Sequence, residues 1–305
     1  MIGALFKQYD ALCKEILSQK IILAWIMKEC MAEYSEWSAE AIARDYIETE
    51  PQVSHISVDE EGGEWMPRIR GTNVEAVSST EGKITYDIRF TAIVPETGRR
   101  IWIDVEPQKN FRPGYSLLKR GTYYLARMIS SQRGREFRGS DYDDLKKAYT
   151  VWICMKPPKK WEHRIKFYEV QDRDKSMGTV FGTEDFDLMT QVVICLGDPD
   201  DPRAVGLLRL LSVLLTNVYS VDEKQRILES EFGIVLTDTI RKGMNSMCNL
   251  GEGIYEDGIE RGMGILNQLY LTLISRGRFE DLERAAQDDE FRQSLMNEFG
   301  LSFRN

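Results

Sequence analysis

The hydrophobic positions in the first part of the chain follow a helical pattern. Leu5–Tyr34 contains no glycine or proline, and its centre, Ile21–Met27, is apolar on every face, which is typical of a buried helix. Ser38 can cap a second helix over Ala39–Glu48, and Pro51 ends the pattern. The sequence therefore predicts an N-terminal helical segment, residues 1–60, that packs on the core.

Residues 61–200 show a mixed pattern that predicts an α/β core. Lys83–Val94 alternates and is rich in β-branched and aromatic residues, which favours a strand. Pro95–Gly98 is typical of a turn, and Arg99–Gln108 of the second strand of a hairpin. Ala148–Met155 is a nearly continuous apolar run, which is typical of a strand buried on both faces. We also expect a helix over Tyr115–Gln132 and strands over Arg164–Val170 and Gln191–Leu196.

Residues 201–305 return to a helical pattern. Glycines recur there at a spacing near four, from Gly251 to Gly264, which indicates either a close helix–helix contact or a weak helix. The whole pattern predicts an α/β (α+β) fold with a mixed central sheet flanked by helices, N-terminal helices and a C-terminal helical extension. The helices expected in this last part are Ala204–Tyr219, Asp222–Phe232, Thr237–Cys248, Ile254–Arg276 and Phe279–Phe299.

The predicted hairpin carries the candidate chemistry. If its strands pair symmetrically about the Pro95–Gly98 turn, Asp87 lies opposite Glu106, with Cβ atoms about 5 Å apart. Asp104, Glu106 and Gln108 alternate along their strand and so share one face with Asp87. Carboxylates this close repel each other unless a cation such as Mg²⁺ lies between them. Two alternatives stay open: a bulge that shifts the pairing, or an ordinary solvent-facing polar side of the ribbon.

Charge is distributed unevenly along the chain. The net charge is −9, which argues mildly against nucleic acid as a partner. The segment Arg99–Arg138, however, contains ten basic residues against three acidic ones. It suits a phosphate backbone beside the carboxylates, and the alternative is a solvated helix whose charges are paired.

Cysteine usage and hydropathy bear on location. The five cysteines are far apart and lack zinc-ligand spacing, so we expect buried thiols in a reducing cytoplasm. The longest apolar stretches, Ile21–Met27 and Leu207–Leu215, fall short of the roughly 18–20 residues of a membrane span. The N-terminus has no secretory signal pattern. His55 and His163 lie in no recognisable motif, which argues against a serine or cysteine hydrolase.

Several stretches together resemble one family. The order strand–Asp–turn–strand–Glu-x-Gln–helix–buried strand is similar to the PD-(D/E)XK nuclease core. The chain resembles the PD-(D/E)XK nuclease family transposases, also described as Rpn-type recombination-promoting nucleases of gut Firmicutes. The segment YEDGIERGMG resembles a short form of their terminal repeats. The resemblance is carried by LSQKIILAWIMKEC, RIRGTNVE, KITYDIRFTAIVP, IDVEPQKNFRPGYSLLKRGTYYLARMIS, YTVWICMKPPKK and DLMTQVVICLGDP.

The resemblance implies a restriction-endonuclease-like core over residues 61–200 and a metal-dependent DNA endonuclease of transposase or recombination-promoting type. It implies Mg²⁺, for which Mn²⁺ could substitute, and DNA as the partner. No organic cofactor and no membrane are expected, and a homodimer stays open. Hydrolysis of a phosphodiester would use a metal to lower the pKa of water and to stabilise the developing oxyanion.

The family's site residues map onto this chain position by position. Asp87 and Glu106 would bind the metal, and Gln108 would position the attacking water or the phosphate in place of the superfamily lysine. Asp104 and Glu75 are further candidate ligands, with Glu48 and Glu50 as weaker alternatives to Glu75. The residues expected to contact the DNA backbone are Lys109, Arg112, Lys119, Arg120 and Arg127.

The chain departs from the family pattern at several positions. Tyr86 precedes Asp87 where the family has proline, and Gln108 cannot supply the positive charge of lysine. Pro107 lacks an N–H, so we expect this strand end to lie at a sheet edge or to be distorted. The net charge of −9, the acidic tail and Pro107 favour the alternative of a catalytically weak or inactive nuclease fold that acts as a protein-interaction module. Intact Asp87 and Glu106 count against that alternative.

Overall fold

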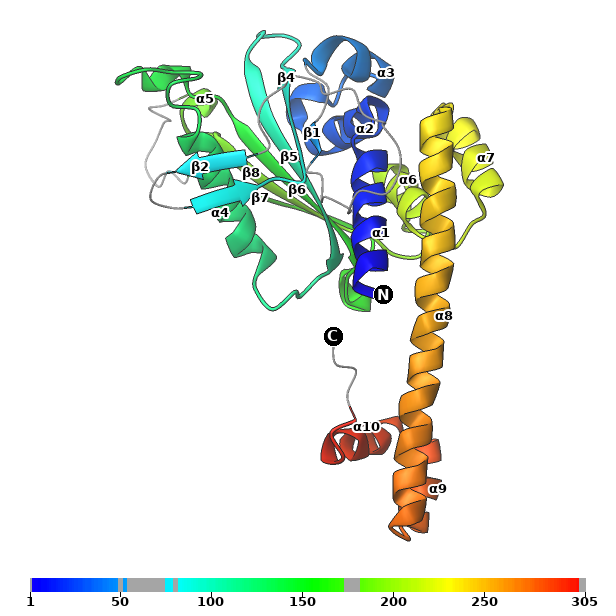
Figure 1. The fold of residues 1–305 in the computed structure, drawn as a ribbon. Coiled ribbons are helices and arrows are strands. Elements are labelled where there is room, and N and C mark those ends of the chain that lie inside the picture. The colour runs from blue at the N-terminus through cyan, green and yellow to red at the C-terminus, as the bar shows by residue number, and fades with distance from the viewer. Residues whose placement is uncertain (1, 49–51, 54–74, 79–81, 173–181, 302–305) are drawn as a thin grey trace. The chain divides into compact units, whose positions relative to one another are not determined.

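A computed structural model of the chain describes residues 2–48, 52–53, 75–78, 82–172 and 182–301. Its centre is a mixed sheet in which β5, β6 and β8 are parallel, β4 pairs antiparallel with β5, and β7 pairs antiparallel with β8 (Figure 1). A two-residue strand, β1, pairs with β4 at one edge. The strands of the sheet, in spatial order, are β1 (Gln52–Val53), β4 (Ile88–Ile93), β5 (Arg100–Asn110), β6 (Ala148–Lys156), β8 (Met189–Cys195) and β7 (Arg164–Glu169).

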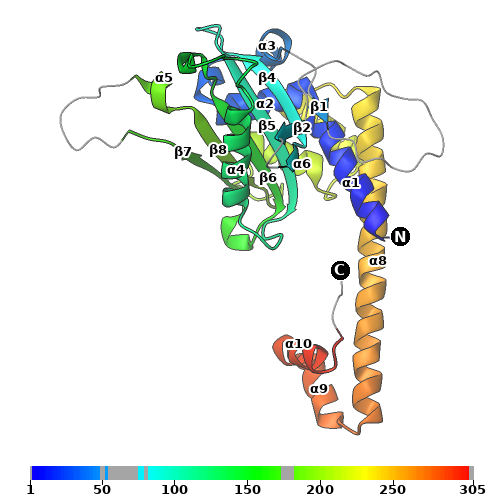
Figure 2. The ribbon, with the colours of Figure 1, turned by 60° about the vertical axis from the view of Figure 1, so that its left-hand side comes forward.

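Helices cover both faces of this sheet (Figure 2). α4 (Leu117–Ser130) packs on one face, where Trp102 and Trp152 join its apolar residues in a core cluster. The helices α1 (Ile2–Leu17), α2 (Lys20–Cys30) and α6 (Gly206–Leu215) pack on the other face, against Ile103 and Val105. The alternation along β5 thus divides its side chains between two cores, which confirms a mixed sheet flanked by helices.

The N-terminal helical stretch contains a break. The sequence pattern predicts Leu5–Tyr34 as one helical stretch, but α1 ends at Leu17 and α2 begins at Lys20, because Gln19 is extended (ψ 128°). The burial of Ile21–Met27 is confirmed, since most of these side chains lie in the core and Ile21 and Trp25 pack against it. Ser38 caps the next helix, as predicted: its Oγ accepts from the N–H of Ala41 at 3.2 Å. This segment contains η1 (Ala32–Tyr34), α3 (Ala39–Ala41) and η2 (Ile42–Tyr46), a π-helical turn.

The stretch Lys83–Val94 forms two strands instead of one. β3 (Gly82–Thr85) pairs with β2 (Glu75–Ser78) in a separate ribbon, and β4 begins only at Ile88. The pairing of β4 with β5 runs from Ile88 with Val105 to Ile93 with Arg100, so it is symmetric about the predicted turn. The observed pairing therefore has no bulge shift, and Asp87 and Glu106 come directly after its last pair, Ile88 with Val105, with Asp87 outside β4.

The predicted strands β6, β7 and β8 are present, and the buried pattern of β6 is confirmed. Short elements that were not predicted are η3 (Tyr142–Asp144), η4 (Lys159–Trp161) and α5 (Thr183–Phe186). The four cysteines whose side chains are described, Cys13, Cys30, Cys154 and Cys195, are buried free thiols, as expected. Within the described ranges, no helix is both long enough and apolar enough to cross a bilayer.

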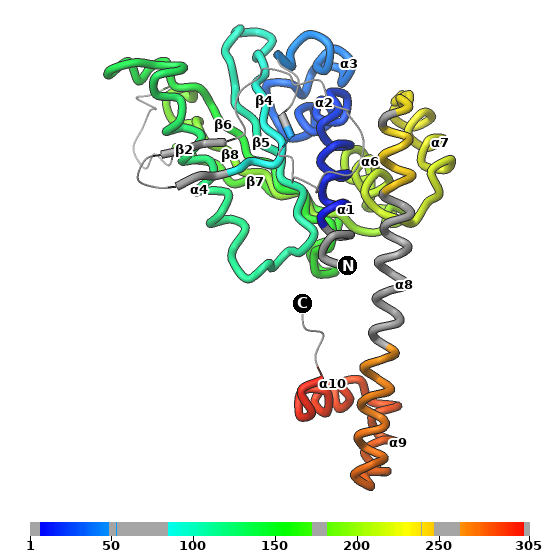
Figure 3. Tube along the Cα trace, in the orientation of Figure 1, coloured from blue at the N-terminus to red at the C-terminus, as the bar shows by residue number. Residues whose placement is uncertain are grey.

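The C-terminal part is helical, as predicted, but with different boundaries (Figure 3). The pattern predicts two helices over Thr237–Cys248 and Ile254–Arg276, yet α8 (Asp238–Ser275) is continuous and its glycines do not interrupt it. The chain forms two compact units, one of Lys7–Cys248 and a second of Met1–Phe6 with Asn249–Asn305. This part also contains α7 (Val221–Phe232), α9 (Phe279–Gln287) and α10 (Asp289–Glu298).

Candidate active site

Two carboxyl groups lie on the face of the sheet that α4 covers, and a third lies near them, next to the start of β4. Asp104 and Glu106 extend from β5 and are 0% and 2% exposed, and Asp87 lies just ahead of β4. The polar side of the hairpin therefore does not face solvent, and that alternative interpretation is wrong: α4 and its aromatic cluster cover this face. Burial of several acidic side chains together is costly and marks a functional candidate.

Hydrogen bonds fix the orientation of these carboxyl groups. The backbone N–H of Asp87 donates to Oε1 of Glu106 at 2.9 Å, so the two residues are linked directly. Thr150 on β6 donates its hydroxyl to Oδ2 of Asp104 at 2.8 Å. The other oxygen of Asp104, Oδ1, is buried and has no hydrogen-bond partner among the described residues. One buried acceptor therefore remains available to a ligand or a proton.

The environment raises the pKa of all three carboxyl groups. Burial raises the pKa of Asp104 to about 7, and the charge of Asp87 adds to this, against the hydrogen bond from Thr150. Burial also raises the pKa of Glu106 well above its ordinary value, reinforced by the charges of Asp104 and Asp87. Burial raises the pKa of Asp87 as well, although Lys14 opposes the shift. The cluster thus favours bound protons or a bound cation at neutral pH.

A lysine from α1 supplies a cation to this cluster. Nζ of Lys14 lies 2.8 Å from Oδ1 of Asp87 and 2.6 Å from Oδ2 of Asp10, and its side chain is only 6% exposed. Asp10 and Lys14 are one turn apart and share one face of α1. No sequence motif pointed to either residue. The available signal was a charged pair, spaced by four, in a helix whose neighbouring Cys13 and Leu17 are buried.

Arg120 approaches the cluster from α4. Its Nη2 lies 3.8 Å from Oε2 of Glu106, longer than a hydrogen bond. Tyr115 and Tyr124 hold the guanidinium through their hydroxyl oxygens, and Trp152 lies beneath it at 5.2 Å from the ring centroid. The prediction that the helix after the hairpin brings basic residues beside the carboxylates is therefore met by Arg120.

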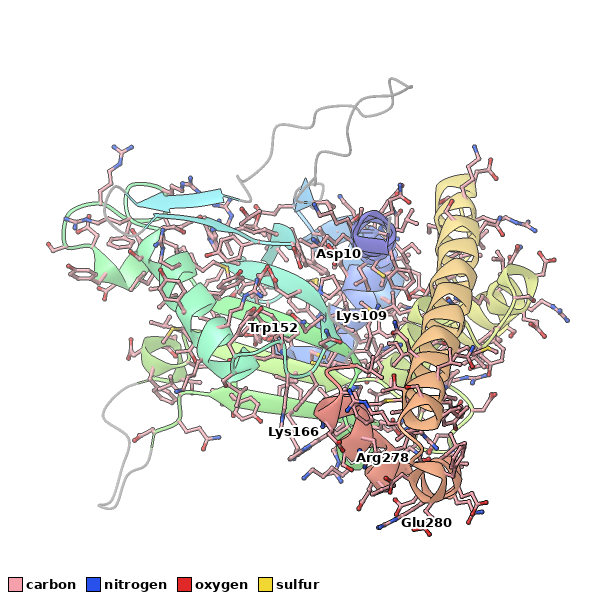
Figure 4. The ribbon with its side chains drawn as sticks, turned by 60° about the horizontal axis from the view of Figure 1, so that its bottom comes forward. Asp10, Lys109, Trp152, Lys166, Arg278 and Glu280 are labelled. Atoms are coloured by element: carbon pink, nitrogen blue, oxygen red, sulfur yellow. The ribbon has the colours of Figure 1, made fainter. Side chains whose placement is uncertain are left out.

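The other predicted DNA-contacting residues differ in position. Lys119 is exposed on the first turn of α4, and Arg112 is exposed in the loop before it. Arg127 is buried (6% exposed) and bonds to the hydroxyl of Tyr123 at 3.4 Å, so the structure does not present it to a DNA backbone in solvent. Lys109 faces the side of α1, as expected for a regular strand, and its pKa is lowered by burial and by Lys156 (Figure 4).

Gln108 and Pro107 occupy the end of β5 beyond its partner β4. Gln108 is half-buried and alternates with Glu106, so it lies on the face of the carboxylates. β4 pairs with β5 only as far as Val105, and beyond it β6 provides the paired strand. Pro107 thus lies where one side of β5 lacks a paired strand among the described residues, which confirms the expected edge.

Of the candidates for an additional N-terminal carboxylate, only Glu48 has a described side chain, and it pairs away from the cluster. Glu75 begins β2, opposite Thr85, and its side chain lies outside the described residues, as does Glu50. Glu48 forms an ion pair with Arg100, with Oε2 and Nε 2.6 Å apart. Asp10 is the acidic side chain of the N-terminal helices that reaches the cluster, through Lys14.

Arg89 is a further buried cation that the sequence did not single out. It pairs in register with Asp104, is 1% exposed, and its guanidinium lies between the rings of Tyr86 and Trp102, at 4.7 and 4.6 Å. Burial lowers its pKa. The signal was available: Arg89 is a charged residue in the apolar half of the predicted strand.

The donor set partly fits a hard divalent cation. The candidate ligands are all carboxylate oxygens. Asp87 and Glu106 are joined by a hydrogen bond, and Oδ1 of Asp104 has no hydrogen-bond partner among the described residues. The described residues contain no group of three or more His, Cys, Asp or Glu side chains arranged to hold a metal. Mg²⁺ needs no such group, since it binds through one or two carboxylates and keeps several waters.

No family model, curated protein or solved structure matches this chain.

Proposed function

We propose that the protein is a metal-dependent DNA endonuclease that hydrolyses phosphodiester bonds, of the transposase or recombination-promoting type. The observation that carries this proposal is the buried carboxyl group of Glu106, which accepts a hydrogen bond from the backbone N–H of the half-buried Asp87 and lies beside the buried Asp104. Buried carboxylates that lie close together lower the stability of a protein, and such groups are typical of active sites.

Asp87 and Glu106 would hold the metal, with Mg²⁺ as the favoured ion and Mn²⁺ as its substitute. The ion would supply a water of lowered pKa and positive charge for the phosphate. Gln108, on the same face, would donate a hydrogen bond to that water or to a phosphate oxygen. Arg120 would contribute charge toward a phosphate at the same place, because its aromatic neighbours hold it beside Glu106.

The contacts of the site also support a second candidate, a nuclease-like fold that does not cut and serves in protein interactions. Lys14 already neutralises Asp87, and Arg120 already lies near Glu106, so the cluster has internal cations. A cluster neutralised in this way can persist without a metal. The two candidates differ in whether a divalent ion binds and DNA is cut.

The deciding experiment incubates the protein with supercoiled plasmid and Mg²⁺ or Mn²⁺, beside Asp87→Ala, Glu106→Gln and an EDTA control. We expect nicking that requires the metal and falls by at least about 100-fold in both variants, as for loss of a group that acts in the transition state. Asp45→Ala, a change to an exposed carboxylate, serves as the matched control and should cut normally. Absence of cutting by the wild type, with no metal binding by calorimetry, would favour the interaction module.

A further inference from the structure

A group of exposed cations lies on the last residue of β6, the loop that follows it and β7. All of them are solvent-exposed, and none forms an ion pair within the described part of the chain. On a chain of net charge −9, a cluster of unpaired positive charges indicates an anionic partner. The residues are Lys156, Lys159, Lys160, Arg164 and Lys166.

Aromatic side chains lie among these cations. Tyr168 on β7 is 46% exposed and shares the face of Lys166, whereas Phe167 between them, 47% exposed, projects from the other face. The guanidinium of Arg164 lies 5.8 Å from the ring centroid of Trp161. Cations next to exposed rings match the two needs of a single nucleic-acid strand: phosphate neutralisation and base stacking. A duplex offers phosphates but keeps its bases stacked on one another.

The register of the sheet links this edge strand to the carboxylates. Directly paired residues project from the same face, so Lys166 and Tyr168 lie on the face that carries Asp104 and Glu106. The separation is three strand spacings, about 14 Å. The two rows of paired residues are Glu106–Trp152–Val193–Lys166 and Asp104–Thr150–Gln191–Tyr168, and Figure 4 labels Trp152 and Lys166.

α4 lies over the middle of these rows, where Gly121 approaches Gln191 and Tyr124 packs on Trp152. A strand that runs between the carboxylates and β7 would therefore cross the exposed side of α4, which carries Lys119. Lys156, the last residue of β6, pairs in register with Asn110 and so adds positive charge on the face of Glu106.

We propose that β7 and the loop before it bind one unpaired strand of DNA that leads to the carboxylate site. Arg164 and Lys166 contact its phosphates, and Tyr168 stacks on a base. The choice of DNA rests on the proposed function. The protein would accordingly favour a substrate with single-stranded DNA next to the cut over a continuous duplex.

The test measures binding of the full-length protein in EDTA, where nothing is cut, by fluorescence anisotropy. The probes are a labelled single-stranded DNA, the duplex of the same sequence and the matching single-stranded RNA. We expect Tyr168→Ala to weaken single-stranded DNA binding roughly tenfold and duplex binding hardly at all, because only the unpaired bases reach the ring. Tyr168→Phe, which keeps the ring, should bind like the wild type.

Lys166→Gln tests the phosphate contact separately. Removing one phosphate contact should lower the slope of log affinity against log salt by about 0.7 for a single strand. Lys242→Gln, a change to an exposed lysine of α8, serves as the matched control and should leave the slope unchanged. An unchanged slope in Lys166→Gln would contradict the contact.

The result that would overturn the proposal is equal binding of single-stranded DNA by the wild type and Tyr168→Ala. Equal weakening of single-stranded and duplex binding would also overturn it, and tighter binding of RNA would overturn the choice of DNA. The proposed function can fail independently. If the protein does not nick plasmid but its binding depends on Tyr168, the proposed strand-binding surface is supported and the proposed nuclease activity is not. If it nicks plasmid but its binding does not depend on Tyr168, only the proposed surface is wrong.

Discussion

At the residue scale, the site combines buried acids with cations that come from both sides of the sheet. Lys14 reaches Asp87 from α1, and Arg120 reaches toward Glu106 from α4. Asp104 has no cation in an ion pair among the described residues, although Arg89 is its register partner. The carboxyl groups thus differ in how far nearby cations neutralise them. Single substitutions should reveal this difference as changes in the free energy of unfolding.

We expect Asp104→Asn to stabilise the protein above neutral pH. Burial raises the pKa of Asp104 from 3.8 to about 7, so the folded state holds this proton more tightly than the unfolded state. The contribution of Asp104 to the free energy of unfolding is therefore greatest below about pH 4, and it is lost as the pH rises through 7. The amide removes that loss, so the free energy of unfolding at pH 8 should rise on the order of 1–3 kcal/mol.

The measurement compares thermal unfolding of Asp104→Asn and wild type in EDTA at pH 5 and pH 8. The gain should be large at pH 8 and small at pH 5. A loss of equal size at both values would show that Asp104 is ionised and well stabilised in the folded protein.

Lys14→Met should destabilise the protein and make it more responsive to divalent ions. Breaking a fully buried ion pair costs about 3–5 kcal/mol. Because the side chain of Asp87 is 20% exposed, we expect roughly 2–4 kcal/mol here. Mg²⁺ or Mn²⁺ should then raise the melting temperature of Lys14→Met more than that of the wild type, since the carboxylates lack their internal cation.

Lys7→Met, on the same helix but exposed, is the control and should change neither quantity. If Mg²⁺ or Mn²⁺ raises the melting temperatures of Lys14→Met and wild type by the same amount, the ammonium group of Lys14 does not compete with a metal for the carboxylates.

At the element scale, close approach of α4 to the sheet positions Arg120. Gly121 allows this approach: a Cβ atom there would lie 2.2 Å from Nε2 of Gln191. Gln191 is itself buried and donates to the carbonyl of Leu117 at 3.3 Å. The glycine next to Arg120 therefore determines how deeply the first turns of α4 pack, and thus where the guanidinium lies.

Gly121→Ala should lower the free energy of unfolding by about 1–2 kcal/mol, as expected for overpacking that outweighs the helix preference of alanine. The double variant Gly121→Ala/Gln191→Ala should be more stable than additivity of the single variants predicts, because the shorter side chain makes room. Chemical denaturation of the four proteins measures this. Strict additivity would mean that Gln191 moves aside at no cost.

At the scale of the whole molecule, the two compact units have cores of very different size. The unit Lys7–Cys248 contains the sheet and both large apolar clusters. Among the described side chains of the C-terminal unit, the buried cluster consists of Leu269, Leu273, Ala285 and Leu295, with a few partly buried neighbours. A core this small gives little stability, so we expect this unit to open before the sheet does.

Leu273→Ala should destabilise the C-terminal unit alone. Leu273 is fully buried, and truncation of such a leucine costs about 2–5 kcal/mol. Hydrogen exchange should therefore become fast in α9 and α10, while β5 and β6 stay protected. Leu271→Ala, on the same helix but 66% exposed, is the control. Faster exchange in β5 as well would show that the two units unfold together.

Local pattern was enough to predict most elements and the register of the hairpin. The symmetric turn at Pro95–Gly98 predicts the observed pairs from Ile93 with Arg100 to Ile88 with Val105, next to Asp87 and Glu106, because hairpin register depends on the turn and on strand alternation. It failed at breaks inside uniform patterns, such as Gln19 between α1 and α2. Ser18, Gln19 and Lys20 include no glycine or proline, so the sequence has no helix-breaking signal there, and only packing decides where the chain bends.

The sequence by itself determined the α/β order, the alternation of β5 and the shared face of its acids, since these depend on neighbours along the chain. Only the tertiary structure decided that Asp104 and Glu106 are buried, that Lys14 neutralises Asp87 and that Arg127 lies inside. The physical reason is that burial and charge pairing depend on which helix covers which part of the sheet. Contacts such as Lys14 with Asp87 join residues more than 70 positions apart, and no local pattern records them.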